Sequence, residues 1–416
     1  MNLKRVVVTG LGAFTPIGNT FNEYWDALIK GTSGAGPITL FDTTHFKTKF
    51  ACELKNYNPE NYFDRKDVRK YDRCAQLGLI ASEEAILHSK ILDYGGLDKS
   101  KVGVIWGSGI GGLITFEQEV TDFARGNGIP RFNPFFIPKM IADITPGHIS
   151  IKHGFMGPNY ATVSACASAS NALIDAKMLI QLGKANVIVT GGSEAAVATP
   201  GIGGFNALHA LSTRNEDPKT ASRPFDKGRD GFVLGEGAGC LILEEYEHAI
   251  KRGATIYAEL AGGGLSADAY HMTAPHPDGL GAYNVMKATL EDAGLEKEAV
   301  EHVNMHGTST PLGDVAESNA ILKLFGDHAY TLSINSTKSM TGHLLGAAGA
   351  IEALAAIGTI MYGIIPPTIN HFTADEAIDP KLDFTFNTAK KRDISVAMSN
   401  TFGFGGHNAC VLLKKI

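Results

Sequence analysis

The sequence has few charged residues, no long apolar run and no paired cysteine motif. Charged residues make up 19% of its 416 positions, below the roughly 25% of an average soluble domain. There are 37 Lys and Arg against 43 Asp and Glu, a net charge of −6, so the chain lacks the basic surplus typical of nucleic-acid-binding proteins. We therefore expect no nucleic-acid partner. The 44% hydrophobic fraction excludes intrinsic disorder.

Segments that would cross or enter a membrane are also missing. The longest nearly apolar stretch, residues 353–365, has 13 residues, whereas a bilayer-spanning helix needs about 20. The apolar run 6–8 is too short for the core of a signal peptide. We expect a cytoplasmic protein without membrane contact, in which 353–365 is a buried helix.

The cysteines are scattered and odd in number, and no CxxC pair is present. They are Cys52, Cys74, Cys166, Cys240 and Cys410. This pattern predicts neither a disulfide framework nor a zinc site. Buried thiols in a reducing compartment are the expectation. No carboxylate-rich ligand cluster accompanies them, so we expect neither a metal nor a cofactor.

Glycine, by contrast, is abundant, at 48 residues. The glycine-rich segments 9–14 and 107–112 each follow a predicted strand. The first lacks the third glycine of a dinucleotide fingerprint, and the second lacks the Gly-Lys-Ser/Thr of a phosphate-binding loop. We interpret both as tight turns in which glycine lets backbones approach closely.

Short apolar runs alternate with helical patterns along the whole chain. Strands are expected at 102–106, 187–190, 240–244 and 302–305, and helices at 71–88, 165–182 and 344–362. Such alternation predicts an α/β fold. A charged helical segment ends near residue 252 and a new strand follows it, which predicts two halves, 1–253 and 254–416.

Cys166 is the cysteine most open to a chemical role. It lies among small residues, 163–170, where a helical pattern begins at Ala169 and continues through Leu173. A helix N-terminus stabilises a thiolate, although a buried structural thiol remains the alternative for this residue taken alone.

Two histidines stand at similar junctions between strand and helix. His306 ends an apolar strand before a polar loop, and His343 precedes an alanine-rich helix. Cysteine with histidine favours nucleophilic acyl chemistry, and a Cys–His hydrolase remains open at this point. The glycine loop 399–408 is either a wide hairpin or a loop whose backbone N–H groups face a reacting carbonyl.

Taken in order, these segments resemble the β-ketoacyl-acyl-carrier-protein synthases, the type II condensing enzymes in particular. The most specific segments are 163–170, 304–314, 336–349 and 400–408, and the resemblance covers essentially the whole chain. It implies a thiolase-like fold, a duplicated five-layer α/β/α/β/α sandwich. It also implies a homodimer, acyl carrier protein as partner, and malonyl-dependent condensation in fatty acid elongation.

The resemblance also implies roles by position. Cys166 would take the acyl chain, with the N–H groups of Cys166 and Phe402 holding the oxyanion. His306 and His343 would polarise the malonyl thioester while carbon dioxide leaves. Phe402 would be the gate residue. The supporting positions are Glu317, Lys338, Asp314, Thr308 and Thr310. Glu317 with Asp314 also fits a helix-capping pair.

The same pattern discriminates within the superfamily. Initiating synthases carry Asn where His343 stands, and chain-length factors lack the nucleophile, so Cys166 favours an active subunit over a non-catalytic polyketide partner. Ile110 resembles the bulky acyl-pocket residue of type II enzymes. His407 departs from the Thr of many relatives, and we expect little consequence.

An acidic carrier protein needs a basic surface to dock on. The densest basic stretch is 64–71. We expect docking residues at Lys66, Arg69, Lys70 and Arg131.

Overall fold

The computed structural model describes residues 3–416 and is built around one ten-stranded mixed sheet. Its strand order is β10-β9-β13-β14-β8-β1-β7-β6-β4-β5. The strands of the first half are β1 (Val6–Phe14), β4 (Val102–Gly107), β5 (Asn159–Thr162), β6 (Val187–Glu194) and β7 (Gly237–Glu245). Those of the second half are β8 (Ala258–Ala267), β9 (His302–Asn304), β10 (Ser333–Asn335), β13 (Val396–Gly403) and β14 (His407–Lys414). Two small ribbons, β2 (Gly36–Pro37) with β3 (Phe50–Ala51) and β11 (Ile364–Ile365) with β12 (Lys390–Lys391), lie outside this sheet.

The two halves repeat one topology. If the five strands of each half are numbered along the chain, both sheets have the order 3-2-4-5-1, with strands 3, 2 and 4 parallel and the other pairings antiparallel. The halves join where β1 pairs with β8 through Val7 and Val8. The predicted α/β class and the two similar halves are thus confirmed. The boundary after residue 253 falls between the last helix of the first half and β8, and it stays a prediction.

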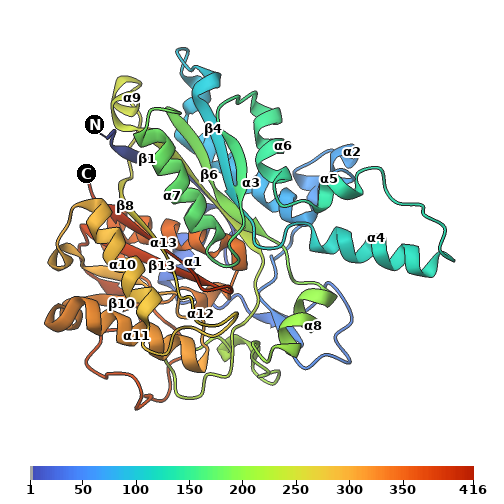
Figure 1. The fold of residues 1–416 in the computed structure, drawn as a ribbon. Helices are drawn as coiled ribbons and strands as arrows, with labels where there is room; N and C mark the ends of the chain where they lie inside the picture. Colours follow the sequence, from blue (N-terminus) through green and yellow to red (C-terminus); the bar gives the residue numbers. More distant parts are fainter. Residues whose placement is uncertain (1–2) are drawn as a thin grey trace.

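The helices form three layers around the two five-stranded halves of the sheet (Figure 1). In the middle lie α7 (Ser168–Gln181) and α13 (Ala348–Tyr362), which contact strands of both halves. The outer face of the first half is covered by α3 (Arg73–Ser89) and α6 (Ile144–His153), and that of the second by α10 (Leu280–Ala293) and α11 (Pro311–Phe325). The remaining helices are α1 (Phe21–Ile29), α2 (Arg65–Val68), α4 (Leu113–Arg125), α5 (Phe136–Met140), α8 (Thr199–Ala207), α9 (Tyr246–Lys251) and α12 (Lys338–Thr341).

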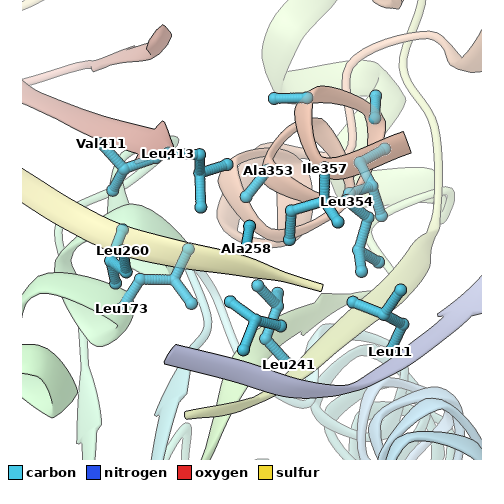
Figure 2. Packing of buried hydrophobic residues seen from close by; sticks show 14 of the residues in the cluster. Leu11, Leu173, Leu241, Ala258, Leu260, Ala353, Leu354, Ile357, Val411 and Leu413 are labelled. Atoms are coloured by element: carbon cyan, nitrogen blue, oxygen red, sulfur yellow. The ribbon is translucent and has the colours of Figure 1, made fainter. Parts of the chain in front are cut away.

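Alternating side chains on each strand build a core on both faces. On β7, Leu241 and Leu243 point into the central core, whereas Cys240 and Ile242 pack under the outer helices. Successive strand residues point to opposite faces, so continuous apolar runs are what a sheet covered on both sides requires. Figure 2 shows the central core, where side chains of α13 meet those of β7, β8 and β14.

Some predicted boundaries were wrong. The apolar stretch 353–365 is not one helix, because α13 ends at Tyr362, where Gly363 adopts a φ of +62°, and β11 follows. A left-handed residue after the last turn is a common way for a helix to end. The segment Leu345–Tyr362 is long and apolar enough to cross a membrane, but 89% of it is buried inside the protein. The helix expected at 344–362 is therefore present as α13, and it is buried in the core.

Candidate active site

The turn before α7 presents Cys166 at the edge of a cavity. Ala165 has a φ of +50°, and the first residue of α7 is Ser168. A non-glycine residue with positive φ is strained. At Ala165 this conformation turns the chain sharply between β5 and α7. The Cys166 side chain is buried, with 8% exposure. It therefore lies where the sequence pattern placed it, just ahead of a helix.

His343 faces the sulfur directly. Its Nε2 lies 3.0 Å from Sγ of Cys166. The backbone of His343 is fixed on both sides, because its N–H donates to Val233 O at 2.7 Å and its carbonyl accepts from Gly235 N–H at 3.0 Å. The edge of the Phe232 ring packs against the imidazole at 5.3 Å between centroids. The imidazole is thus held in contact with the thiol.

His306 completes the group from the second half of the chain. It follows β9, and its ring lies 5.2 Å from that of His343 at an angle of 88°. Glu317 on α11 anchors it, since Oε1 accepts the His306 N–H at 2.9 Å and Oε2 accepts the Gly307 N–H at 3.0 Å. Glu317 therefore positions His306 through the backbone. The carboxylate makes no helix cap, so the alternative of a capping pair is wrong.

These side chains share one cavity of about 430 Å³. The predicted residues that line it are Cys166, His306, His343, Thr308, Thr310, Glu317 and Phe402. The hydroxyls of Thr308 and Thr310 lie 3.1 Å apart. Most of the remaining lining is apolar, as is usual for small-molecule sites.

Burial sets the charge state of the cavity. It raises the pKa of the Cys166 thiol to about 12, although the Lys338 charge and the Phe404 N–H both act to lower that pKa. Burial, with the Lys338 charge, also holds the pKa values of His306 and His343 well below 6.5. At neutral pH the resting site therefore holds a neutral thiol and two neutral imidazoles. Burial is the largest influence on the pKa of this thiol, and it acts against the thiolate that the helix N-terminus was expected to stabilise.

Comparison with known proteins agrees with this geometry. Residues 3–249 match the family model described as Beta-ketoacyl synthase, N-terminal domain, and residues 257–372 match its C-terminal domain. The chain belongs to the β-ketoacyl synthase family. It is 48% identical to a 3-oxoacyl-[acyl-carrier-protein] synthase 2 of Synechocystis sp. over 412 residues, which cover 99% of this chain and 98% of the relative.

Solved structures of ketosynthases match this synthase over its whole length. A β-ketoacyl synthase from Burkholderia phymatum has a TM-score of 0.92 and 36% identity over 99% of this chain and 100% of that chain. A type II polyketide ketosynthase in complex with its acyl carrier protein has a TM-score of 0.88 and 33% identity, with both chains covered to 100%. The thiolase-like fold is thereby confirmed.

The predicted activity is confirmed as well. This β-ketoacyl synthase is an acyltransferase that condenses malonyl-acyl-carrier protein with an acyl chain in fatty acid elongation. The type 2 relative agrees with the predicted preference for type II over type I.

Two of the predicted supporting residues, Lys338 and Asp314, are buried outside the cavity lining. Lys338 is 1% exposed and forms an ion pair with Glu352 on α13, and its charge lowers the pKa values of both histidines and of Cys166. Asp314 accepts the Phe225 N–H at 2.9 Å and lies 3.5 Å from Arg229. Neither Lys338 nor Asp314 lines the cavity.

The hairpin between β13 and β14 places a different backbone N–H beside Cys166 from the one expected, that of Phe402. The backbone N–H near the Cys166 sulfur is that of Phe404, where it lowers the pKa of the thiol. Phe402 pairs with Asn408 in the strand ladder, and its ring lies 5.4 Å from His306. The backbone donor beside the sulfur is therefore the N–H of Phe404 and not that of Phe402, the residue expected to hold the oxyanion. Gly403 separates two similar residues, and only the backbone path distinguishes them.

The other predicted residues of the synthase lie outside the cavity. Ile110 follows β4 and is 42% exposed. The carrier-docking candidates are exposed, three on or just after α2 and Arg131 in the loop before α5. Lys70 is paired with Asp67 at 2.9 Å. Glu194, a buried carboxylate at the end of β6, was not among the predicted site residues. A single acidic residue closing an apolar strand was the signal for it.

Proposed function

We propose that Cys166 is the nucleophile that takes the acyl chain from the carrier thioester. The 3.0 Å contact between His343 Nε2 and Cys166 Sγ carries this proposal. As the sulfur attacks the acyl carbon, the thiol proton passes by way of the imidazole to the leaving carrier sulfur. The N–H groups of Cys166 and Phe404 hold the oxyanion that forms in between.

His306 and His343 then act on the malonyl thioester. Both are neutral at pH 7, so each has one N–H. Once the acyl chain is on Cys166, Nε2 of His343 has no thiol proton to accept, and in the Nε2–H tautomer each histidine donates to the thioester carbonyl without adding a charge to a buried site. The bond between the malonyl α-carbon and its carboxylate breaks, carbon dioxide leaves, and the electron pair of that bond stays on the α-carbon as a carbanion. The carbanion attacks the acyl carbon and the Cys166 sulfur leaves as a thiolate. The thiolate then takes up a proton from solvent. Thr308 and Thr310 line the malonyl side of the cavity.

One experiment tests both half-reactions. The synthase is incubated with acyl and malonyl carrier, and mass spectrometry measures acyl-Cys166 and the product longer by two carbons. Cys166→Ala should abolish both species. Cys166→Gln should retain malonyl decarboxylation without condensation. Product formation by Cys166→Ala would disprove the nucleophile assignment. Release of free acid without a condensed product would favour a hydrolase.

Acyl-chain selection is proposed for the loop after β4. Ile110 would form one wall of the acyl pocket, and its exposure in a single chain allows it to face a partner subunit. Ile110→Phe should shorten the longest accepted acyl chain. An unchanged chain-length profile would remove Ile110 from the pocket.

The carrier protein is proposed to dock on the basic stretch at α2. Lys66 and Arg69 are exposed, and neither has an ion-pair partner among residues 3–416. A solved relative binds its own acyl carrier protein. Charge reversal of Arg69 and Lys70 should raise the KM for the carrier at low salt. Lys287→Glu on α10, where the lysine side chain is 55% exposed, is the control away from α2. Equal KM values for the two variants would refute the docking surface.

A homodimer is proposed through the free edge of the sheet. β5 ends the ten-stranded sheet, and an unpaired edge is a template for another strand. Val163, the residue after β5, is 62% exposed, and Ile137 on α5 is 56% exposed. The helix α4 projects from the body of the molecule (Figure 1). Val163→Glu should dissociate the dimer in sedimentation, whereas Ile250→Glu on α9 should not. A monomeric wild type would refute this proposal.

The cytoplasm is proposed as the compartment of the synthase. All five cysteines are free and buried, as expected where thiols stay reduced.

A further inference from the structure

Glu194 is a fully buried carboxylate that no step above uses. It closes β6 and is 0% exposed. Its Oε2 accepts the N–H groups of Gly109 at 2.7 Å and Gly346 at 3.1 Å, and its Oε1 accepts the Ile110 N–H at 3.3 Å. No cation pairs with Glu194 among residues 3–416. Backbone donors alone hold this buried acid.

The three bonds bring together the segments that surround the nucleophile. A Cβ built on Gly109 would lie 2.7 Å from Glu194 Oε2 and 3.3 Å from the carbonyl oxygen of Ala165, the neighbour of Cys166. A Cβ on Gly346 would overlap the backbone nitrogen of Gly109. Gly346 is three residues beyond His343. Glu194 therefore sits where the Ile110 loop, the turn before α7 and the turn before α13 touch.

The duplication of the fold relates the Gly346 turn, which contacts Glu194, to the Cys166 turn of the first half. Ala165, three residues before α7, has a φ of +50°, and Leu345, three residues before α13, has a φ of +46°. Cys166 and Gly346 are therefore equivalent in the two halves. The Cys166 N–H is proposed to hold the reacting oxyanion, whereas the equivalent Gly346 N–H already holds the Glu194 carboxylate.

We propose that Glu194 is a positioning residue, which fixes the Ile110 wall of the acyl pocket against the turns that carry Cys166 and His343. This inference rests on the proposed function, in which the acyl chain resides on Cys166 beside Ile110. A carboxylate suits the position because three N–H donors converge on two oxygens. A glutamine would turn its NH₂ group against at least one of those donors and leave it unsatisfied.

The test compares Glu194→Gln with Glu84→Gln. Glu84 is a matched control away from the cavity. Like Glu194, it accepts backbone N–H groups, in its case from Ala13 and Phe21, each at 2.8 Å. Burial raises the pKa of both carboxyl groups to about 7. The rate of Cys166 acylation is measured with short, medium and long acyl carriers. We expect Glu194→Gln to lose about tenfold or more in acylation by long chains and to change the order of preferred chains. Glu84→Gln should stay within about twofold of wild type.

A second readout separates positioning from general damage. Malonyl decarboxylation, measured with Cys166→Gln added to each variant, depends on His306 and His343. Glu317 anchors His306, and backbone bonds to Val233 and Gly235 hold His343 without Glu194. Decarboxylation should stay within about twofold in the Glu194→Gln background. Equal losses in both half-reactions, or the same acylation profile for Glu194→Gln and Glu84→Gln, would overturn the inference.

A variant on the opposite side of the contact covers a folding failure. Gly109→Ala displaces the same carboxylate from the loop side and should reproduce the altered chain preference; a wild-type preference would overturn the inference. Cys166→Ala keeps the two proposals apart. If Cys166→Ala still forms the product, the proposed function fails. If only Glu194→Gln and Gly109→Ala behave like wild type, the positioning role alone fails.

Discussion

The charge state of Cys166 can be measured by its reactivity. Burial raises the pKa of the thiol from 9.0 to about 12, and three pKa units correspond to about 4 kcal/mol of lost thiolate stability. At pH 7 such a thiol is ionised in roughly one molecule in 10⁵. Because only the thiolate is alkylated, the rate of alkylation should rise about tenfold for each pH unit and show no plateau near neutral pH.

The assay follows iodoacetamide labelling of the Cys166 peptide by mass spectrometry from about pH 6.5 to about pH 9.5, below the pKa of an ordinary lysine. Cys166→Ala identifies the labelled peptide. The four other cysteines are buried, so their labelling reports unfolding at the extremes of pH. A plateau below pH 8 would show a thiolate–imidazolium pair already formed in the resting enzyme. That result would refute the conclusion that burial is the largest influence on the pKa of this thiol.

Three further predictions follow from the same contacts. Glu317→Ala should lower the condensation rate by about 10²-fold and the free energy of unfolding by about 1–3 kcal/mol, because the His306 N–H loses its acceptor. Glu317→Gln keeps one acceptor oxygen, so its rate should lie between those of wild type and Glu317→Ala. Equal rates for the two variants would contradict this. Gly403→Ala should block acylation in a protein that still unfolds cooperatively, since the new Cβ would lie 2.7 Å from Ser164 O and 3.0 Å from Cys166 N; normal acylation would contradict the close approach. Burial raises the pKa of Glu84 and of Glu317 to about 7, so each favours the folded state while protonated, and that contribution is lost as pH rises from 4.5 through 7. Denaturant unfolding should show a shallower fall in stability over this range for Glu84→Gln, and an unchanged slope would contradict the raised pKa.

Much of the fold was predictable because its strands are buried on both faces. Continuous apolar runs identify β4, β6 and β7 without any need for alternation. The duplication of the two halves followed from the family resemblance, because the sequence alone showed only α/β alternation. The edge strand β5 was missed because Asn159 and Tyr160 are exposed, so no apolar run marks it. The helix α4 was missed for a related reason, since it buries only Thr115 in a single chain.

The residues that meet in the cavity, Cys166, His306 and His343, could be singled out because each lies at a junction rich in glycine and small residues. The contacts that tune them could not. The Glu317 carboxylate reaches the backbone of a loop eleven positions away, and Glu194 bridges segments separated by 85 and 152 positions. Such partners depend on tertiary packing, and for Glu194 and Gly346 on packing between the halves, about which local sequence carries no information. The net pKa of Cys166 depends in the same way on the depth of burial, which a helix-start pattern does not encode.

The duplication itself explains why the site lies where it does. α7 and α13 follow the third strand of their own five-stranded halves, and both pack between the two halves of the sheet. Their N-terminal turns therefore meet, one with Cys166 and the other with His343 just before it. The loops after the second strands, β4 and β9, reach the same place with Ile110 and His306. Because equivalent elements converge, one half can keep its turn open for an acyl group while the other fills its turn with Glu194. On the proposed roles, catalysis requires both halves and also requires that they differ. A chain with two open turns would lose the fixed pocket wall, and one with two filled turns would lose the oxyanion site.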